Sequence, residues 1–452
     1  MAISNVKYKL EEYLQKEYSI RGLEDIEVYN DIPLWRIIRT RFRKTLMESP
    51  SKTTQPEKGK VLYYTIKSLW QIIKLKFSGK HYENVVFPHA RLFNVNGIFI
   101  ERLSDPFIDY STIKDDYIIF ERCQNGKHHT PRFHAEKIIY WDIVTTTSFI
   151  ASIFFRKQLT KRYDTEIDEL IQCIKQEFDV NNSIKAFIQS QFADYIVSEY
   201  LSRKILNIVS PKRVFLAART TYQYVMPYCK THGITTYEWQ HGITHGETSL
   251  YSGKYNKNFD PDYFLCFGKD NLRPVFGMPI ERMINVGFAY KEYINNLTVK
   301  EHLEKHVLVI SEPMISQTVV DFVAKTAGQY PSITFDIRCH PQEKLSKDMF
   351  EQLEKCSNVK VVENKTESFV ALNKYDRILG ENSSVMYEAL FLGKKVGRLN
   401  YDGLKVVNSG MIGGDIINNA EELRLFFESN EPSPNLLELY SDFNVDVVNN
   451  LK

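Results

Sequence analysis

The sequence predicts an α/β protein with two doubly wound parallel sheets, one in each of two domains. The chain has 452 residues, which is too long for one ordinary hydrophobic core. Short apolar runs alternate with longer helical patterns, as parallel sheets with covering helices require. This alternation occurs twice, on either side of the polar stretch "KEYINNLTVKEHLEK", which we interpret as an inter-domain connection.

Residues 1–80 form a basic amphipathic region before the first domain. The segments "IPLWRIIRTRFRKTL" and "SLWQIIKLKFSGK" each combine a tryptophan with aliphatic and basic residues, and "ESPSKTTQPEKGK" between them has a loop composition. Such helices either bury an apolar face in the protein or lie on an anionic membrane or acidic polymer. Both interpretations stay open.

Residues 81–290 are expected to form the first Rossmann-like domain. The runs "NVVFPHARLF", "KRVFLAART", "GITTYEWQ", "PDYFLCFG" and "MINVGF" have strand patterns, and residues 164–207 have helical periodicity. Open parallel sheets bind ligands at the carboxyl ends of their strands. The residues placed at those ends, and hence beside a cleft, are Arg219, Gln240, His241, Gly242 and Gly268.

Residues 305–420 repeat the pattern and should form the second Rossmann-like domain. Its expected strands are "HVLVIS", "ITFDIRCHP", "VKVVE", "DRILGENSS" and "KVGRLN". A tail over residues 421–452 completes the chain.

Composition excludes several classes of protein. The net charge of +2 argues against a dedicated nucleic-acid binder. The six cysteines include no C-x-x-C pair, which indicates reduced thiols in a cytoplasmic protein. Met1 to Tyr18 is too polar for a signal peptide, and the longest nearly apolar stretch, 138–155, is too short and polar to span a bilayer. We expect a soluble protein, at most peripheral on the inner face of the cell membrane.

The strongest chemical signal lies in the second domain. "RCHP" places Arg338, His340 and Pro341 at the carboxyl end of a strand, and "ENSSVMYEALFLGKK" places polar residues at the start of a helix, namely Asn382, Ser383 and Ser384. A helix N-terminus with hydroxyl side chains binds anions. The alternative is that a serine merely caps the helix.

These motifs resemble the GT-B glycosyltransferases of bacterial surface polysaccharide synthesis, over about residues 210–400. That group includes Kdo transferases, sialyl- and polysialyltransferases and the related glycerophosphate transferases of teichoic-acid assembly. His340–Pro341 matches the HP motif and Ser383–Ser384 the serine motif, which bind the donor's nucleotide phosphate in those families. Glu388 matches an acidic position that contacts the donor ribose or sugar, and "QHG" (240–242) resembles a segment of capsule-type members.

The resemblance implies two Rossmann-like domains facing a central cleft and a nucleotide-sugar donor. It also implies a glycan or lipid-linked glycan acceptor. CMP-Kdo or CMP-sialic acid is the favoured donor, and a UDP- or GDP-sugar is the alternative. Teichoic-acid transferases have Asp-Tyr-Ser-Ser where this chain has Glu-Asn-Ser-Ser at 381–384, so phosphotransfer from CDP-glycerol or CDP-ribitol ranks second. A non-catalytic glycan-binding assembly protein is the rival of another class.

Glycosyl transfer needs a general base on the acceptor side. The candidates are His241, His245 and Glu247, with His89, Asp105, Asp109 and the loop 127–134 as further possibilities. A metal site is the rival interpretation of two segments. His241 and His245 have the spacing of zinc ligands on a helix, but "HGITH" is a poor helix and lacks the glutamate of a zinc motif. Asp260-Pro261-Asp262 resembles an Asp-x-Asp pair that holds a divalent ion, but it has the pattern of a turn. We therefore expect metal-independent chemistry without a cofactor, in which protein donors stabilise the leaving phosphate.

Overall fold

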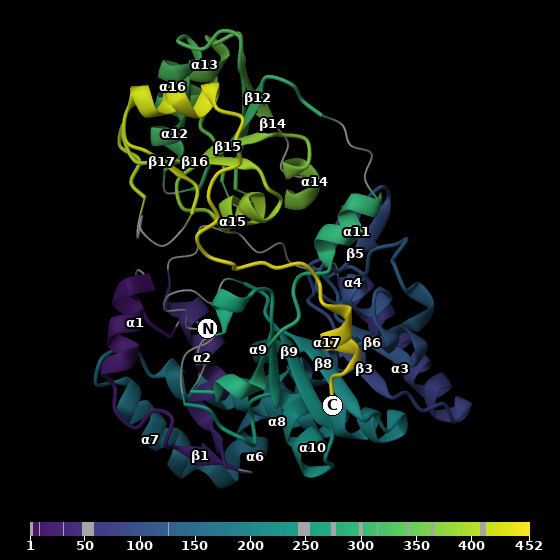
Figure 1. Ribbon diagram of the computed structural model, residues 1–452. Coiled ribbons are helices and arrows are strands. Elements are labelled where there is room, and N and C mark those ends of the chain that lie inside the picture. Colours follow the sequence, from purple (N-terminus) through teal and green to yellow (C-terminus); the bar gives the residue numbers. More distant parts are fainter. Residues whose placement is uncertain are drawn as a thin grey trace.

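Two α/β domains, each built on a parallel sheet, make up the protein (Figure 1). The computed structural model describes residues 3–8, 10–29, 31–47, 58–124, 126–242, 254–272, 277–297, 302–313, 315–340, 343–362, 366–406 and 413–452.

The first domain contains a seven-stranded sheet with the order β11-β10-β9-β8-β3-β6-β7. Every adjacent pair is parallel, and most strand residues are buried on both faces, which explains their nearly continuous apolar runs. The strands are β3 (Asn84–Phe87), β6 (Tyr117–Glu121), β7 (Ile138–Tyr140), β8 (Arg213–Ala217), β9 (Thr235–Trp239), β10 (Tyr263–Cys266) and β11 (Met283–Asn285).

Helices and two short hairpins surround this sheet. The hairpins are β1 (Glu27–Val28) with β2 (Ile32–Pro33) and β4 (Phe93–Val95) with β5 (Ile98–Ile100). The helices are α1 (Leu10–Ser19), α2 (Leu34–Leu46), α3 (Lys58–Ser78), α4 (Ser104–Asp109), α5 (Asp142–Phe154), α6 (Arg156–Thr160), α7 (Asp164–Ile174), α8 (Ser183–Val209), α9 (Arg219–Tyr222), α10 (Met226–Thr231) and α11 (Tyr290–Leu297).

Helix α2 belongs to the core of the first domain. Trp35 is buried and its indole N–H donates to Glu17 Oε1 (3.2 Å). The guanidinium of Arg36 binds Asp260 at 2.7 Å, and that of Arg39 contacts Glu17. The apolar side of the first basic segment therefore packs inside the protein, and two of its arginines, Arg36 and Arg39, neutralise buried carboxylates.

The second domain contains a six-stranded parallel sheet with the order β14-β13-β12-β15-β16-β17. Its strands are β12 (His306–Ile310), β13 (Thr334–Arg338), β14 (Val359–Val362), β15 (Arg377–Gly380), β16 (Lys395–Leu399) and β17 (Asp415–Ile417). Its helices are α12 (Ser316–Ala327), α13 (Lys347–Glu354), α14 (Ser368–Leu372), α15 (Ser384–Phe391) and α16 (Ala420–Glu428).

The chain returns to the first domain after α16. In Figure 1 the yellow segment runs from the upper domain down to the lower one, where α17 (Val445–Asn449) lies beside the first sheet. A Cβ on Gly268 would overlap the backbone of Glu438 to Tyr440 in this segment, and a Cβ on Gly287 would overlap Asp442. The stretch expected to be a tail is thus divided between the two domains.

Two Rossmann-like domains, with a C-terminal segment that crosses back to the first, form the GT-B arrangement that the sequence predicts. No helix in the described part of the chain is both long and apolar enough to cross a bilayer.

Candidate functional site

The HP and serine motifs meet at one edge of the second sheet. Strands β13 and β15 both pair in parallel with β12, one on each side. Parallel strands end at the same edge, so His340, which follows β13, and Ser383, which follows β15, flank the carboxyl end of β12. Pro341 lies outside the described residues.

Helix α15 begins at this edge without a side-chain cap. Ser383 is the N-cap residue, with an extended backbone (φ −58°, ψ 146°), but its hydroxyl makes no capping hydrogen bond. Ser383 thus occupies the N-cap position without the side-chain hydrogen bond by which a serine closes a helix. The exposed Ser384 begins the helix, and Asn382 donates from Nδ2 to the carbonyl of Lys405 (3.1 Å). The first N–H groups of α15 and two hydroxyls are therefore grouped at one end of the helix, an arrangement that suits an anion.

A buried glutamate fixes the turn that carries His340. Glu343 accepts the backbone N–H of His340 at Oε2 (2.8 Å) and the hydroxyl of Ser311 at Oε1 (2.5 Å). The side chain of Arg338 donates to the carbonyl of Thr366. Glu343 was not anticipated from sequence, because nothing in the local pattern separates it from a surface glutamate.

Arg102 joins the two domains at the cleft. Its Nη1 lies 3.3 Å from Oε1 of Glu388 on α15. Burial alone would lower the pKa of Arg102, but Glu388 and Glu367 raise it above its ordinary value. Glu388 is only 3% exposed, and its Oε2 accepts no hydrogen bond from the described residues. A buried carboxylate oxygen without a hydrogen-bond partner destabilises the folded protein, unless a bound ligand supplies the missing donor.

Arginines from both domains experience the same carboxylates. Burial lowers the pKa of Arg91 in the first domain and of Arg338 in the second, and Glu367 and Glu388 oppose that shift for both. Glu367 is buried, and its carboxylate caps α14 by accepting the N–H of Phe369 (2.7 Å). The carboxyl edges of the two sheets therefore face one charged cleft.

Two histidines lie next to each other on the first-domain side. His89 follows β3 and His241 follows β9, on either side of β8. Their rings stack with centroids 6.1 Å apart and planes 19° apart. Burial, followed by Arg102, Arg91 and Lys44, lowers the pKa of His89 to about 4. Burial, followed by His89 and Arg219, lowers the pKa of His241 to about 3. Both rings are therefore neutral at pH 7.

A groove of about 980 Å³ extends from this histidine pair across the first domain. We call it the basic groove, because its described lining includes five cationic side chains and a single carboxylate, Asp194. Burial lowers the pKa of Arg43 and of Lys44, since the groove partly removes them from water. Hydroxyls from α5, α8 and the segment 218–224 share the lining. The five cations are Arg41, Arg43, Lys44, Arg122 and Arg156.

Several residues expected in the cleft have structural roles instead. Arg219 is 2% exposed and binds two buried carboxylates, Asp260 and Glu238 (Nε to Oε2, 3.1 Å). Gln240 is also buried, and its Oε1 accepts the N–H of Phe267 (3.0 Å), which ties β9 to β10. Gly268 accommodates the returning C-terminal segment.

Gly242 differs from Gly268, because a Cβ there would meet no atom of the described residues within 4 Å. His245 and Glu247, the other two candidates for the base, lie outside the described residues.

The loop at 127–134 also folds inward. His128 lies between Glu121 (3.0 Å) and Asp142 (2.7 Å). Arg132 binds Glu121 (2.7 Å) and Asp105. Asp105 is fully buried in this cluster, so it is a structural carboxylate and cannot serve as an accessible base.

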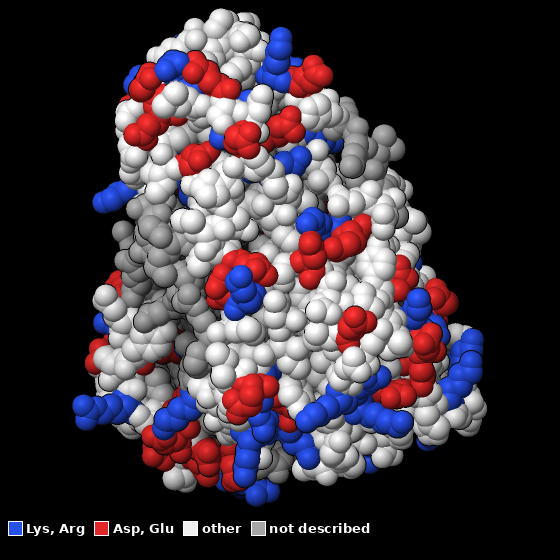
Figure 2. Space-filling model, viewed as in Figure 1, with Lys and Arg blue, Asp and Glu red and all other residues white. Residues whose placement is uncertain are grey.

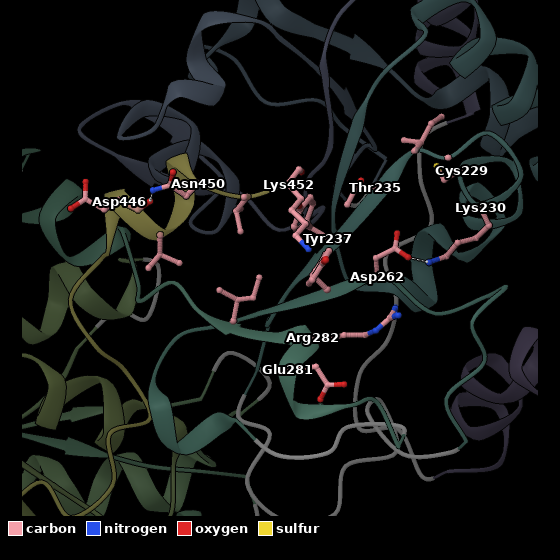
Figure 3. A pocket seen from close by; sticks show the side chains of 16 residues that line it. Cys229, Lys230, Thr235, Tyr237, Asp262, Glu281, Arg282, Asp446, Asn450 and Lys452 are labelled. Atoms are coloured by element: carbon pink, nitrogen blue, oxygen red, sulfur yellow. Dashed lines mark hydrogen bonds and ion pairs between the residues drawn. The ribbon is translucent and has the colours of Figure 1, made fainter.

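A second hollow, of about 1060 Å³, lies at the opposite edge of the first sheet, near the amino ends of β9 and β10 (Figure 3). Its main charged pair is satisfied internally, because Lys230 Nζ binds Asp262 at 2.6 Å. Asp262 also accepts the N–H and hydroxyl of Thr236 (2.9 and 2.7 Å). Both carboxylates of the Asp260-Pro261-Asp262 segment thus form ion pairs within the first domain, Asp260 with Arg219 and Asp262 with Lys230. Within the described residues, no cluster of three or more His, Cys, Asp or Glu side chains could hold a metal ion.

Comparison with known proteins identifies no close relative. No family model and no curated protein matches the chain. Among solved structures, UDP-GlcNAc 2-epimerase from Methanocaldococcus jannaschii is similar with 12% identity and a TM-score of 0.46, covering 81% of this chain and 97% of that one. The enzyme of that name from Rickettsia bellii has 12% identity, coverages of 82% and 93% and a TM-score of 0.41.

The lipopolysaccharide outer core galactosyltransferase WaaB has 10% identity, coverages of 76% and 88% and a TM-score of 0.41. All these TM-scores are below 0.5, so the fold rests on the strand order and the crossing C-terminal segment. The function has to be inferred from the chemistry of the site.

Proposed function

We propose that the protein is a glycosyltransferase that moves a sugar from a nucleotide donor to a bacterial capsule or lipopolysaccharide glycan. The observation that carries the proposal is the charged cleft. Glu388 of α15, a helix without a side-chain cap, pairs with Arg102 of the first domain, and Arg102 helps to lower the pKa of both His89 and His241. One side of this cleft suits a phosphate leaving group. The other side suits a hydroxyl that must lose a proton.

In this proposal the donor binds to the second domain. His340, Arg338 and the N-terminus of α15 receive the nucleotide phosphate and stabilise the charge that develops on it as the glycosidic bond breaks. The unpartnered Oε2 of Glu388 accepts a hydroxyl of the donor ribose or sugar. CMP-Kdo or CMP-sialic acid is the donor that the motifs favour, ahead of a UDP- or GDP-sugar.

The acceptor binds in the basic groove, with its hydroxyl next to His241. A neutral imidazole can accept the proton of that hydroxyl, and the negative charge of a bound donor offsets the cations that now lower its pKa. The excess of cations over carboxylates indicates an acidic glycan. We place the reaction in the cytoplasm, in keeping with six free cysteine thiols.

A nucleotide panel tests the donor site. CMP, CDP, UDP and GDP are each added at about 100 times Kd, where a ligand adds roughly 2.7 kcal/mol to the free energy of unfolding. We expect CMP to raise Tm most. A response to CDP alone favours the glycerol- or ribitol-phosphate transferase, and no response to any nucleotide contradicts the enzyme proposal and favours the non-catalytic glycan-binding protein.

Substitution of His340 locates the binding site. His340→Ala should remove most of the nucleotide-induced rise in Tm and leave the ligand-free Tm unchanged, because the side chain is exposed. His302→Ala is the matched control, since His302 is also exposed but precedes β12, at the opposite edge of the second sheet. An equal nucleotide response of wild type and His340→Ala would remove His340 from the site.

A further inference from the structure

Helix α3 turns its polar side toward the protein. The buried hydroxyl of Ser68 donates to the carbonyl of Tyr140 (2.5 Å). The amide of Gln71 donates to the carbonyl of Ile138 (3.2 Å) and accepts the N–H of Tyr140 (3.0 Å). Ile138 and Tyr140 belong to β7, the edge strand of the first sheet. The polar residues of α3 thus complete the hydrogen bonds of a sheet edge that would otherwise be open.

The opposite side of α3 is apolar and faces solvent. Helix α3 packs beside α5, which also exposes aromatic side chains. We call this surface the α3–α5 face. Phe77 on α3 is 83% exposed and Phe154 on α5 is 74% exposed. Other exposed members are Leu62, Ile66, Trp70 and Phe149. Contiguous apolar surface of this kind on a folded protein marks an interaction site.

The charge around the face is positive. Residues 58–80 contain six lysines and neither Asp nor Glu, and the segment 143–163 also lacks acidic residues. Lys74 lies with its Nζ 5.5 Å from the ring centroid of Trp70. Where α3 lies in Figure 1, at the lower right, Figure 2 shows basic side chains beside uncharged surface, with acidic side chains next to them.

We propose that the α3–α5 face docks on an anionic lipid bilayer, with α3 lying in the plane of the interface. Aromatic and aliphatic side chains enter the boundary between headgroups and acyl chains, and the lysines contact lipid phosphates. Phe149 and Ile153 of α5 also line the basic groove, so docking brings the groove opening to the membrane, where a lipid-linked acceptor would be presented. Of the two basic segments, the one in α3 (68–80) therefore contacts the membrane in this proposal, whereas the one in α2 (32–46) packs its apolar side into the core.

Trp70 provides a direct test of this docking. The chain has four tryptophans, and Trp70 is 61% exposed, whereas Trp35, Trp141 and Trp239 are buried. Adding phosphatidylglycerol vesicles should shift the fluorescence emission to shorter wavelength, because only Trp70 can change from water to lipid. No shift and no co-sedimentation with these vesicles would overturn the proposal.

Variants separate the apolar and the charged contributions. Leu62→Ser with Phe77→Ser should weaken vesicle binding by at least about tenfold. Lys76→Ala with Lys80→Ala should weaken it by about fivefold for each lysine removed, on anionic vesicles only. Ile280→Ser with Leu436→Ser is the control, because both side chains are exposed elsewhere, and it should bind as wild type does.

A second copy of the chain is the rival occupant of the face. Sedimentation equilibrium that gives a dimer, dissociated by Leu62→Ser with Phe77→Ser, would replace the bilayer with that copy. The same variant should keep the wild-type rise in Tm with nucleotide, because the face is remote from the second domain. Failure of docking is therefore distinguishable from failure of the proposed transferase activity.

Discussion

At the scale of single residues, the cleft keeps two histidine rings uncharged. The pKa of His89 and that of His241 lie well below the ordinary value near 6.5, since burial and nearby cations oppose protonation. In the unfolded chain both rings take up a proton at a higher pH. Stability from these two groups is therefore complete above about pH 6.5 and is lost as the pH falls toward 4 for His89 and toward 3 for His241.

This titration predicts a pH effect on folding. Each histidine should contribute a loss of up to about 1.4 kcal/mol per pH unit below pH 6.5. His89→Asn with His241→Asn should therefore flatten the dependence of the free energy of unfolding on pH, measured by urea denaturation at pH 7.5, 6.5, 5.5 and 4.5. His302→Asn, at an exposed histidine, is the control, and an equal slope for the double variant and wild type would contradict the assignment.

Single residues also show where the sequence is informative. The sequence predicts that His340 and Ser383 lie at one sheet edge, because each follows a strand and parallel strands end at the same edge; the pairing of β13 and β15 with β12 confirms this position. Arg102 and Glu367 were missed, since Arg102 acquires its role from Glu388, 286 positions away in the chain. Arg219 and Asp105 were placed in the cleft because a polar residue near a strand end has the same pattern whether it faces a ligand or a buried counter-ion.

At the scale of elements, α15 begins at the cleft without a side-chain cap, as α12 of the same domain also does. A capping serine replaced by alanine costs about 1 kcal/mol of stability. Ser383→Ala should cost much less, because the Ser383 hydroxyl makes no capping bond, but it should weaken nucleotide binding. Ser346 is the matched comparison, since it caps α13 by accepting the N–H of Met349 (3.3 Å).

Thermal unfolding and nucleotide titration of both variants measure these effects. Ser346→Ala should lower the free energy of unfolding by about 1 kcal/mol and leave nucleotide affinity intact. The reverse pattern, with Ser383→Ala destabilised and its affinity unchanged, would make Ser383 an ordinary cap.

Elements also set the limit of prediction from sequence. The strands were recognisable, because strands buried on both faces have nearly continuous apolar runs. The amphipathic patterns of α2 and α3 are alike, yet α2 buries its apolar residues and α3 exposes them. Periodicity shows that a helix has two faces, but the choice of the inner face depends on partners such as the open edge of β7.

At the scale of the whole molecule, the returning C-terminal segment connects the domains a second time. Gly268→Ala should lower the stability of the first domain by about 1 to 3 kcal/mol, because the added methyl overlaps the backbone of this segment. Gly242→Ala is the matched control, since its Cβ would meet no atom within 4 Å in the part of the chain that the structure describes. Calorimetry of both variants checks this, and equal unfolding temperatures would show that the segment is not packed tightly at Gly268.

The same segment determines when the first domain can finish folding. The last strand of the first domain, β11, ends at Asn285. Nevertheless, Phe267 and Phe288 of this domain pack against Tyr440, and Phe288 donates its N–H to the carbonyl of Ser441 (2.9 Å). During synthesis from the N-terminus, these aromatic side chains therefore wait uncovered while the entire second domain is made. The first domain is translated first but completed last. A ribosome that stalls in the second domain therefore leaves an aggregation-prone intermediate with exposed aromatic side chains, which chaperones would have to bind.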